Sequence, residues 1–294
     1  MDPSHDAPCW HVAIAAELRD ADGRPLQKDR PPSLDELTQT IESALSAEHL
    51  AAPLQVERSG SVQGLFRRAD GIARATETVG GDSWKWAIQS KGLEQSACDT
   101  RVAKGYALAF VLNPRGPDHL TTQIMAEFGM SDEAKALIKQ ITGDESLAVP
   151  NTKEKRAEIV LWHENLYAMN DCLGICTFVS SASFVIGFPH MARLYALATG
   201  TDANEASLSE AGRRVVTLER MFNVREGYTR EKDVLPYRMM HEPIAKGPMA
   251  GHVTSTSELQ EMLNEYFELN GWDPATGIPG RESLERLHLQ GVCA

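Results

Sequence analysis

The stretch Asp171-Cys172-Leu173-Gly174-Ile175-Cys176 (DCLGIC) ends a long helical pattern and precedes a short apolar run. It brings a carboxylate, a glycine and a thiol close together in the chain. A carboxylate can accept hydrogen bonds from the amino and ring N–H groups of a pterin-like heterocycle, and glycine lets the backbone approach a flat ligand closely. A thiolate can ligate iron, but a four-iron cluster normally takes four thiolates. The stretch therefore predicts a binding turn whose other ligands lie elsewhere.

Helical patterns dominate the chain on both sides of this turn. Residues 153–170 lead into it with apolar residues on one face, and residues 207–222 and 257–270 follow with capping signals and apolar stripes. Residues 65–79 form a further helical pattern, which a pair of glycines ends. Alternation of apolar and polar residues is scarce, and residues 106–112 are the one fair strand candidate. We therefore expect a mainly α-helical fold.

Apolar side chains at helical spacing predict parts of the core. In residues 207–222 these side chains are Ala211, Val215, Leu218 and Phe222. In residues 257–270 they are Leu259, Met262, Leu263 and Tyr266. Trp84 and Trp86 are most simply interpreted as core residues as well. His163 and Glu164 lie late in a predicted helix and are interpreted as a solvated or interhelical pair rather than a catalytic dyad.

Composition limits the classes of partner and the cellular location. The formal net charge of −12 argues against nucleic acid, because phosphate binding needs a concentrated basic face. Five scattered cysteines do not form a disulfide framework, which predicts a reducing, cytoplasmic setting. Residues 1–8 are polar and resemble no signal peptide, and the apolar run 175–188 is too short to span a bilayer. We therefore expect neither a nucleic acid nor a membrane as partner.

Seven short segments occur in the order known from one enzyme family. They are 90–94 (SKGLE) with 99–101 (DTR), Arg115-Gly116-x-x-His119, Asp171-x-x-Gly174-x-Cys176, 218–227 (LERMFNVREG), Leu235-Pro236-x-Arg238, Glu242-Pro243 and Gly271-Trp272-Asp273. Together they resemble the tungsten-containing aldehyde ferredoxin oxidoreductase family. Each motif alone is weak, but seven in one order over roughly residues 64–280 identify the chain as similar to this family. The resemblance implies the helical C-terminal domains of such enzymes.

The family resemblance implies a redox activity and two cofactors. Members oxidise aldehydes, or carry out related redox chemistry, with tungsten or molybdenum held by two pyranopterins. A [4Fe–4S] cluster beside the metal passes electrons to a ferredoxin-type acceptor. The cofactor-binding residues carried over from the family motifs are Asp171, Gly174, Ile175 and Arg115, and the cluster ligand is Cys176. His119 becomes the catalytic candidate, for proton transfer or for a hydrogen bond to an oxo ligand, because the pKa of histidine suits such work near neutral pH.

The chain also departs from the family pattern. The family's N-terminal β-rich domain and its C-x-x-C-x-x-x-C group are absent from this sequence. Cys172 is interpreted as a packing residue rather than a ligand. We expect residues 1–60 to be a diverged or unrelated leader that includes a helix beginning at Ser33. Residues 61–95 are expected to end a middle-domain-like helical region, and residues 96–294 to form a C-terminal helical domain.

Three functional hypotheses follow. In the first, the chain is one part of a split tungsten or molybdenum oxidoreductase, and a partner subunit supplies the base domain and the missing cluster cysteines. In the second, it is a non-catalytic helical module for interaction or assembly, derived from the same family. In the third, it is a fragment of a longer reading frame. The sequence leaves open the choice of metal, the substrate, the electron acceptor and the oligomeric state.

Overall fold

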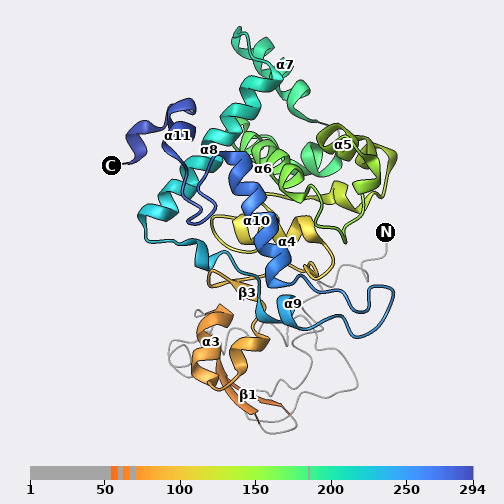
Figure 1. Cartoon of the computed structure of the whole chain (residues 1–294), viewed down its shortest axis with the longest axis vertical. Helices are drawn as coiled ribbons and strands as arrows, with labels where there is room; N and C mark the ends of the chain where they lie inside the picture. Colours follow the sequence, from red (N-terminus) through yellow and green to blue (C-terminus); the bar gives the residue numbers. More distant parts are fainter. Residues whose placement is uncertain (1–53, 59–61, 67–70, 185, 294) are drawn as a thin grey trace, which may run out of the picture. The chain divides into compact units, whose positions relative to one another are not determined.

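The computed structural model describes residues 54–58, 62–66, 71–184 and 186–293. Contacts divide the chain into two compact units, Met1–Ser83 and Trp84–Ala294 (Figure 1). The predicted helix that begins at Ser33 lies outside the described residues. In the part of the chain that is described, no helix is both long enough and apolar enough to cross a membrane.

In the first unit, the described residues form a two-stranded hairpin followed by an α-helix. Strand β1 (Leu54–Arg58) pairs antiparallel with β2 (Val62–Phe66), so that Leu54 lies opposite Phe66. Helix α3 (Gly71–Val79) follows, and Gly80 ends it with a positive φ of 73°. The helix predicted over residues 65–79 therefore ends where expected but starts later, because Leu65 and Phe66 pair in the hairpin instead.

The second unit is mainly helical, as the sequence predicts. Two short strands in its described part, β3 (Gln89–Ser90) and β4 (Leu93–Glu94), form an antiparallel hairpin. Its α-helices in the described chain are α4 (Lys104–Leu112), α5 (Asp132–Thr142), α6 (Arg156–Leu173), α7 (Phe188–Thr199), α8 (Glu205–Arg225), α9 (Tyr237–His241), α10 (Thr256–Asn270) and α11 (Arg281–Arg286).

Helix α4 occupies the centre of the core, in contact with both α6 and α10 (Figure 1). Leu108, Phe110 and Val111 are each 0% exposed. The sequence prediction of a strand over residues 106–112 is wrong. A helix that is surrounded on all sides needs no polar face, so its apolar run shows no helical period and resembles a buried strand.

Helices α6 and α8 pack closely, and a glycine makes this approach possible. A Cβ atom built on Gly212 of α8 would clash with the carbonyl oxygen of Asn165 in α6. Any side chain at this position would push the two helices apart. The close contact matters for the site, because these two helices form facing walls of the cavity described below.

A fully buried ion pair joins α6 to the start of α4. Glu127 accepts hydrogen bonds from the backbone N–H groups of Gly105 (2.8 Å) and Tyr106 (3.3 Å), and its Oε2 lies 3.5 Å from Nε of Arg156. Burial raises the pKa of the Glu127 carboxyl to about 7, against the opposing effect of Arg156. The Glu127 side chain thus provides acceptors for N–H groups in the first turn of α4, which have no partner within the helix. Negative charge is favourable at this N-terminal end of a helix.

The predicted core residues are confirmed in α10 and partly wrong elsewhere. Those of α10 are all buried: Leu259, Met262, Leu263 and Tyr266. In α8, however, Leu218 and Phe222 are 44% and 54% exposed, and Trp84 and Trp86 are 52% and 58% exposed. The sequence prediction also started α8 too late, with Ser207 as the first residue of a capping box. In the structure the N-cap is Asn204, and Ser207 is the second residue of that capping box.

Candidate functional site

The DCLGIC stretch forms the C-terminal end of α6 and the turn after it. Helix α6 continues to Leu173, and Gly174 adopts a left-handed conformation with φ of 67°. The N–H of Ile175 then donates to the carbonyl of Asn170 at 2.8 Å, which closes the turn in the manner of a helix C-cap. A Cβ built on Gly174 would meet nothing within 4 Å, so this glycine serves the backbone conformation and leaves open space beside it.

One buried amide clamps this turn to the following segment. The Asn170 side chain donates to Oγ of Ser181 (2.7 Å) and accepts from Oγ of Ser180 (3.0 Å). Oγ of Ser180 also lies 2.9 Å from the carbonyl oxygen of Cys176. The backbone of Cys176 is therefore fixed, while its thiol remains exposed.

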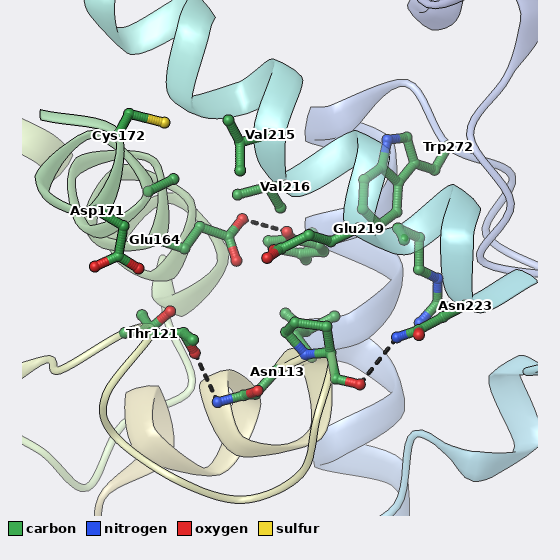
Figure 2. Close-up of a pocket in the computed structure, with 16 residues that line it drawn as sticks. Asn113, Thr121, Glu164, Asp171, Cys172, Val215, Val216, Glu219, Asn223 and Trp272 are labelled. Atoms are coloured by element: carbon green, nitrogen blue, oxygen red, sulfur yellow. Dashed lines mark hydrogen bonds between the residues drawn. The ribbon is translucent and has the colours of Figure 1, made fainter. Parts of the chain in front are cut away.

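A cavity of about 330 Å³ opens beside the last turns of α6 (Figure 2). Its walls come from α6, α8 and the loop after α4, with contributions from α10 and Trp272. The residues that line it are Leu112, Asn113, Pro114, Thr121, Thr122, Glu164, Ala168, Asp171, Cys172, Val215, Val216, Glu219, Arg220, Asn223, Tyr266 and Trp272. The lining thus combines apolar side chains with a small number of carboxyl and amide groups, as small-molecule sites do.

Three carboxyl groups face this cavity. Glu164 and Asp171 lie two turns apart on one face of α6, and Glu219 comes from α8. Figure 2 shows Glu164 and Glu219 pointing toward one another. Burial raises the pKa of Glu164 to about 8, although the hydroxyl of Tyr266 donates a hydrogen bond to it and opposes this shift. Burial, followed by the charge of Asp171, also raises the pKa of Glu219.

Amide groups hold the loop after α4 in place as the opposite wall. The Asn113 side chain donates to the Asp118 carbonyl (3.1 Å) and to Oγ1 of Thr121 (2.6 Å). The Asn223 side chain donates to the carbonyl of Pro114 at 2.9 Å, which ties the loop to α8. Because both amides already have partners, the carboxyl groups are the side chains best placed to bind a ligand.

The predicted site residues fall into two groups in the structure. Asp171 lines the cavity and is exposed at its edge. Gly174, Ile175 and Cys176 lie just beyond it in the turn, outside the lining. Arg115 and His119 lie in the loop after α4 and do not line the cavity either. Their assigned roles stay predictions.

Arg115 and His119 nevertheless lie near this cavity. The Arg115 side chain is 56% exposed and pairs with Asp118 at 2.7 Å. It is close enough to Glu219 to lower the pKa of that carboxyl. His119 is partly buried in the same loop. The loop therefore brings a basic group toward α8 without placing it among the lining residues.

The donor set fits a pterin better than an iron–sulfur cluster. Within the described ranges, no group of three or more His, Cys, Asp or Glu residues could hold a metal ion. Cys172 and Cys176 are exposed, whereas burial and the charge of Glu127 raise the pKa of the Cys98 thiol to about 12, which disfavours a thiolate. These residues alone do not provide four thiolates. Asp171, exposed beside open backbone at Gly174, does suit an N–H-rich heterocycle.

Three side chains near the cavity can be compared with their interpretation from the sequence. His163 is fully buried, and its Nδ1 lies 2.8 Å from the carbonyl of Ile159 in its own helix, so the solvated alternative is wrong for this residue. Glu164 is also buried and pairs between helices, with Tyr266. Cys172, predicted to pack, is exposed at the cavity instead. The seven-residue spacing of Glu164 and Asp171 was the signal available in the sequence.

Comparisons with known proteins agree on one family. The sequence profile of aldehyde ferredoxin oxidoreductase, domains 2 and 3, matches residues 56–289. The tungsten-containing aldehyde ferredoxin oxidoreductase of Thermococcus kodakarensis is 29% identical over 223 residues, which cover 75% of this chain and 33% of that protein. The enzyme of the same name from Pyrococcus furiosus is 29% identical over 222 residues, with the same coverage. The chain thus spans about a third of the length of these relatives.

A solved structure shows a similar fold. The active site complex BamBC of benzoyl coenzyme A reductase, bound to 1,5-dienoyl-CoA, matches with a TM-score of 0.54 and 22% identity. The match covers 76% of this chain and 36% of the solved chain. At this identity the likeness concerns the fold alone. With the profile match over most of its length, the chain belongs to the aldehyde ferredoxin oxidoreductase family and corresponds to a C-terminal portion of it.

Proposed function

We propose that this chain is the C-terminal, cofactor-facing part of a tungsten or molybdenum oxidoreductase. Its substrates would be aldehydes, or a related substrate of oxo-transfer chemistry, with a ferredoxin-type protein as electron acceptor. The observation that carries the proposal is the turn after α6, which presents Asp171 at the edge of a cavity of about 330 Å³. On this proposal, residues 61–95 end the middle domain and residues 96–294 form the C-terminal domain.

The proposed roles follow from the chemistry of each side chain. The Asp171 carboxylate would accept hydrogen bonds from the amino and ring N–H groups of a pterin, close to the backbone of Gly174 and Ile175. The thiol of Cys176 would supply the last ligand of a [4Fe–4S] cluster. Arg115 and His119 would approach from the loop after α4, His119 for proton transfer. When bound, the metal cofactor supplies two-electron redox chemistry.

A partner subunit would complete this site. One exposed thiol at Cys176 cannot hold a four-iron cluster, so three further cysteines would come from another chain. Next to it, Phe178 is 77% exposed, and Leu194 and Leu197 of α7 are 55% and 75% exposed. Exposed apolar side chains of this kind support an interface that involves the segment after Cys176 and helix α7. The relatives, about three times as long as the matched region, support the same conclusion.

Purification from the native host tests the proposal. The chain should copurify with a second subunit, and the complex should contain tungsten or molybdenum and about four irons per active site. Cys176→Ala should lose most of the iron, whereas the matched control Cys172→Ala should keep it. Asp171→Asn should lose tungsten or molybdenum. A folded chain that purifies alone and free of metal would contradict the proposal.

The alternative is a non-catalytic module for interaction or assembly. One observation favours it: the core around α4 closes without any metal-binding group among the described side chains. This alternative expects the chain to fold stably without metal. It also expects Cys176→Ala to leave partner binding unchanged, which a pull-down with the copurifying subunit would show.

A further inference from the structure

Glu164 stands apart from the other buried charged residues. Lys104, Glu127, Arg156, Arg220 and Asp233 are also buried, and each has an ion-pair partner within 4 Å. Glu164 is 7% exposed and has no ion-pair partner among the residues that the structure describes. An ionised carboxylate in such a place is costly, because burial removes its hydration and no cation replaces it.

Burial favours the neutral form of Glu164, whereas the groups around it act in both directions. From α10, the hydroxyl of Tyr266 donates to Oε1 of Glu164. From α8, Glu219 raises the pKa of Glu164 and Arg213 lowers it, both less than burial does. Asp171 lines the same cavity on α6, and the lining residues of the loop after α4 are Asn113, Pro114, Thr121 and Thr122, none of which titrates.

One oxygen of the Glu164 carboxyl group, Oε2, is available to a ligand. Tyr266 occupies Oε1, and Oε2 has no protein partner among the described hydrogen bonds. In Figure 2 the Glu164 carboxyl points into the cavity, toward Glu219 and the loop that carries Asn113. A protonated carboxyl has an O–H donor, so its free oxygen can donate to a ligand.

We propose that Glu164 presents a neutral carboxylic acid to the cavity and donates a hydrogen bond to the carbonyl oxygen of a small ligand bound there. This inference rests on the proposed function and adds a residue that contacts its substrate, because an aldehyde carries a carbonyl oxygen. In this interaction Glu164 keeps its proton, and no bond breaks. Asp171, two turns further along α6, is the complementary group that accepts N–H donors.

Infrared spectroscopy of the full chain tests the protonation state without any cofactor. The wild type should show the C=O stretch of a protonated carboxyl that titrates near pH 8, and Glu164→Gln should remove this component. The stretch of the Glu127 carboxyl, whose pKa is about 7, should remain in both proteins. Glu219→Gln should move the midpoint to lower pH, and Tyr266→Phe should move it to higher pH, because the first removes a like charge and the second a donor to the carboxylate. The control Glu268→Gln changes an exposed side chain of α10 and should leave the midpoint unchanged.

Benzaldehyde binding tests the ligand class. Well above pH 8 the wild-type affinity should fall by about tenfold per pH unit, because only the protonated form donates. Glu164→Gln should bind benzaldehyde with no such decline, since its amide N–H donates at every pH. Glu164→Ala should bind weakly throughout. Metal content measured on the same preparation reports separately on the proposed function.

Three results would overturn the inference. The first is a wild-type spectrum without a protonated carboxyl that titrates near pH 8 beside that of Glu127, and the second is a C=O titration that is the same in the wild type and in Glu164→Gln. The third is benzaldehyde binding that is undetectable in the wild type or equal in wild type and Glu164→Ala at every pH. If Glu164→Gln does not fold, the opposite shifts expected of Glu219→Gln and Tyr266→Phe still decide the matter.

Discussion

The polar side chains at the two ends of α6 differ in burial and in pairing. At the N-terminal end, Arg156 is 0% exposed, pairs with Glu127 and donates a hydrogen bond to the carbonyl of Leu147 at 3.1 Å. At the C-terminal end, Asp171 and Cys172 are exposed beside a cavity. The comparison teaches that one helix has a buried, ion-paired N-terminal end and an exposed C-terminal end beside a cavity. Glu164 lies between them, since it is buried and also lines the cavity.

The largest expected effect comes from removing the buried ion pair between Glu127 and Arg156. Glu127→Ala leaves Arg156 buried without a counter-charge and removes the acceptor for the N–H groups of Gly105 and Tyr106. We expect a loss of about 3–5 kcal/mol in the free energy of unfolding, measured by denaturant titration. A loss under about 1 kcal/mol would show that Arg156 finds another partner or reaches water.

The next largest effect on stability is expected at the close contact between α6 and α8. Gly212→Ala should destabilise the fold by about 1–3 kcal/mol, because the new methyl group meets the backbone of Asn165. The matched control is Gly291→Ala, whose Cβ would meet nothing within 4 Å and should be close to neutral. Denaturant midpoints of the two variants give the comparison. Equal midpoints would mean that α6 and α8 can separate at little cost.

The middle of α6 should respond to pH. The folded pKa of Glu164, about 8, lies above the ordinary 4.5, so the folded state holds more protons than the unfolded state between these values. Its contribution to stability should therefore fall as pH rises from 4.5 to 8, by at most about 1.4 kcal/mol per pH unit. Glu164→Gln should flatten this part of the curve of unfolding free energy against pH. An unchanged slope would contradict the assignment.

The smallest effect on stability is expected at the open end. Asp171→Asn changes an exposed side chain that has no role in the described core, so the free energy of unfolding should change by no more than about 0.5 kcal/mol. On the proposed function, the same variant should also lower the tungsten or molybdenum content of the purified complex. A large loss of stability would instead place Asp171 in the scaffold.

Much of the helical scaffold could be predicted from the sequence. Helices α6, α8 and α10 were all predicted from apolar side chains at helical spacing. The predicted stripe is fully buried in α10, whereas in α8 Leu218 and Phe222 are exposed. Helix α4 was mistaken for a strand because burial on all sides removes that periodicity. Trp84 and Trp86 show the converse limit, since size and apolarity alone do not place a side chain inside.

The site could be predicted only where its residues are adjacent in the chain. Asp171 and the turn at Gly174 are local, and a C-cap glycine has a recognisable pattern. Burial is the main cause of the raised pKa of Glu164. Two groups that modify this pKa lie on other helices: Tyr266, which is 102 residues further along the chain and lowers it, and Glu219 on α8, which raises it. No spacing rule connects three helices, so the sequence could not distinguish this carboxyl from a solvated one. The cytoplasmic location likewise stays a prediction.

The clamp around Asn170 has a consequence for the order of assembly. Its two side-chain hydrogen bonds, to Ser180 and Ser181, hold the turn from within the chain. A turn built in this way can reach its final shape during folding, before any cofactor is present. On the proposed function, we therefore expect the cofactor to be inserted late in maturation, into a turn that has already folded, rather than to nucleate the folding of the chain.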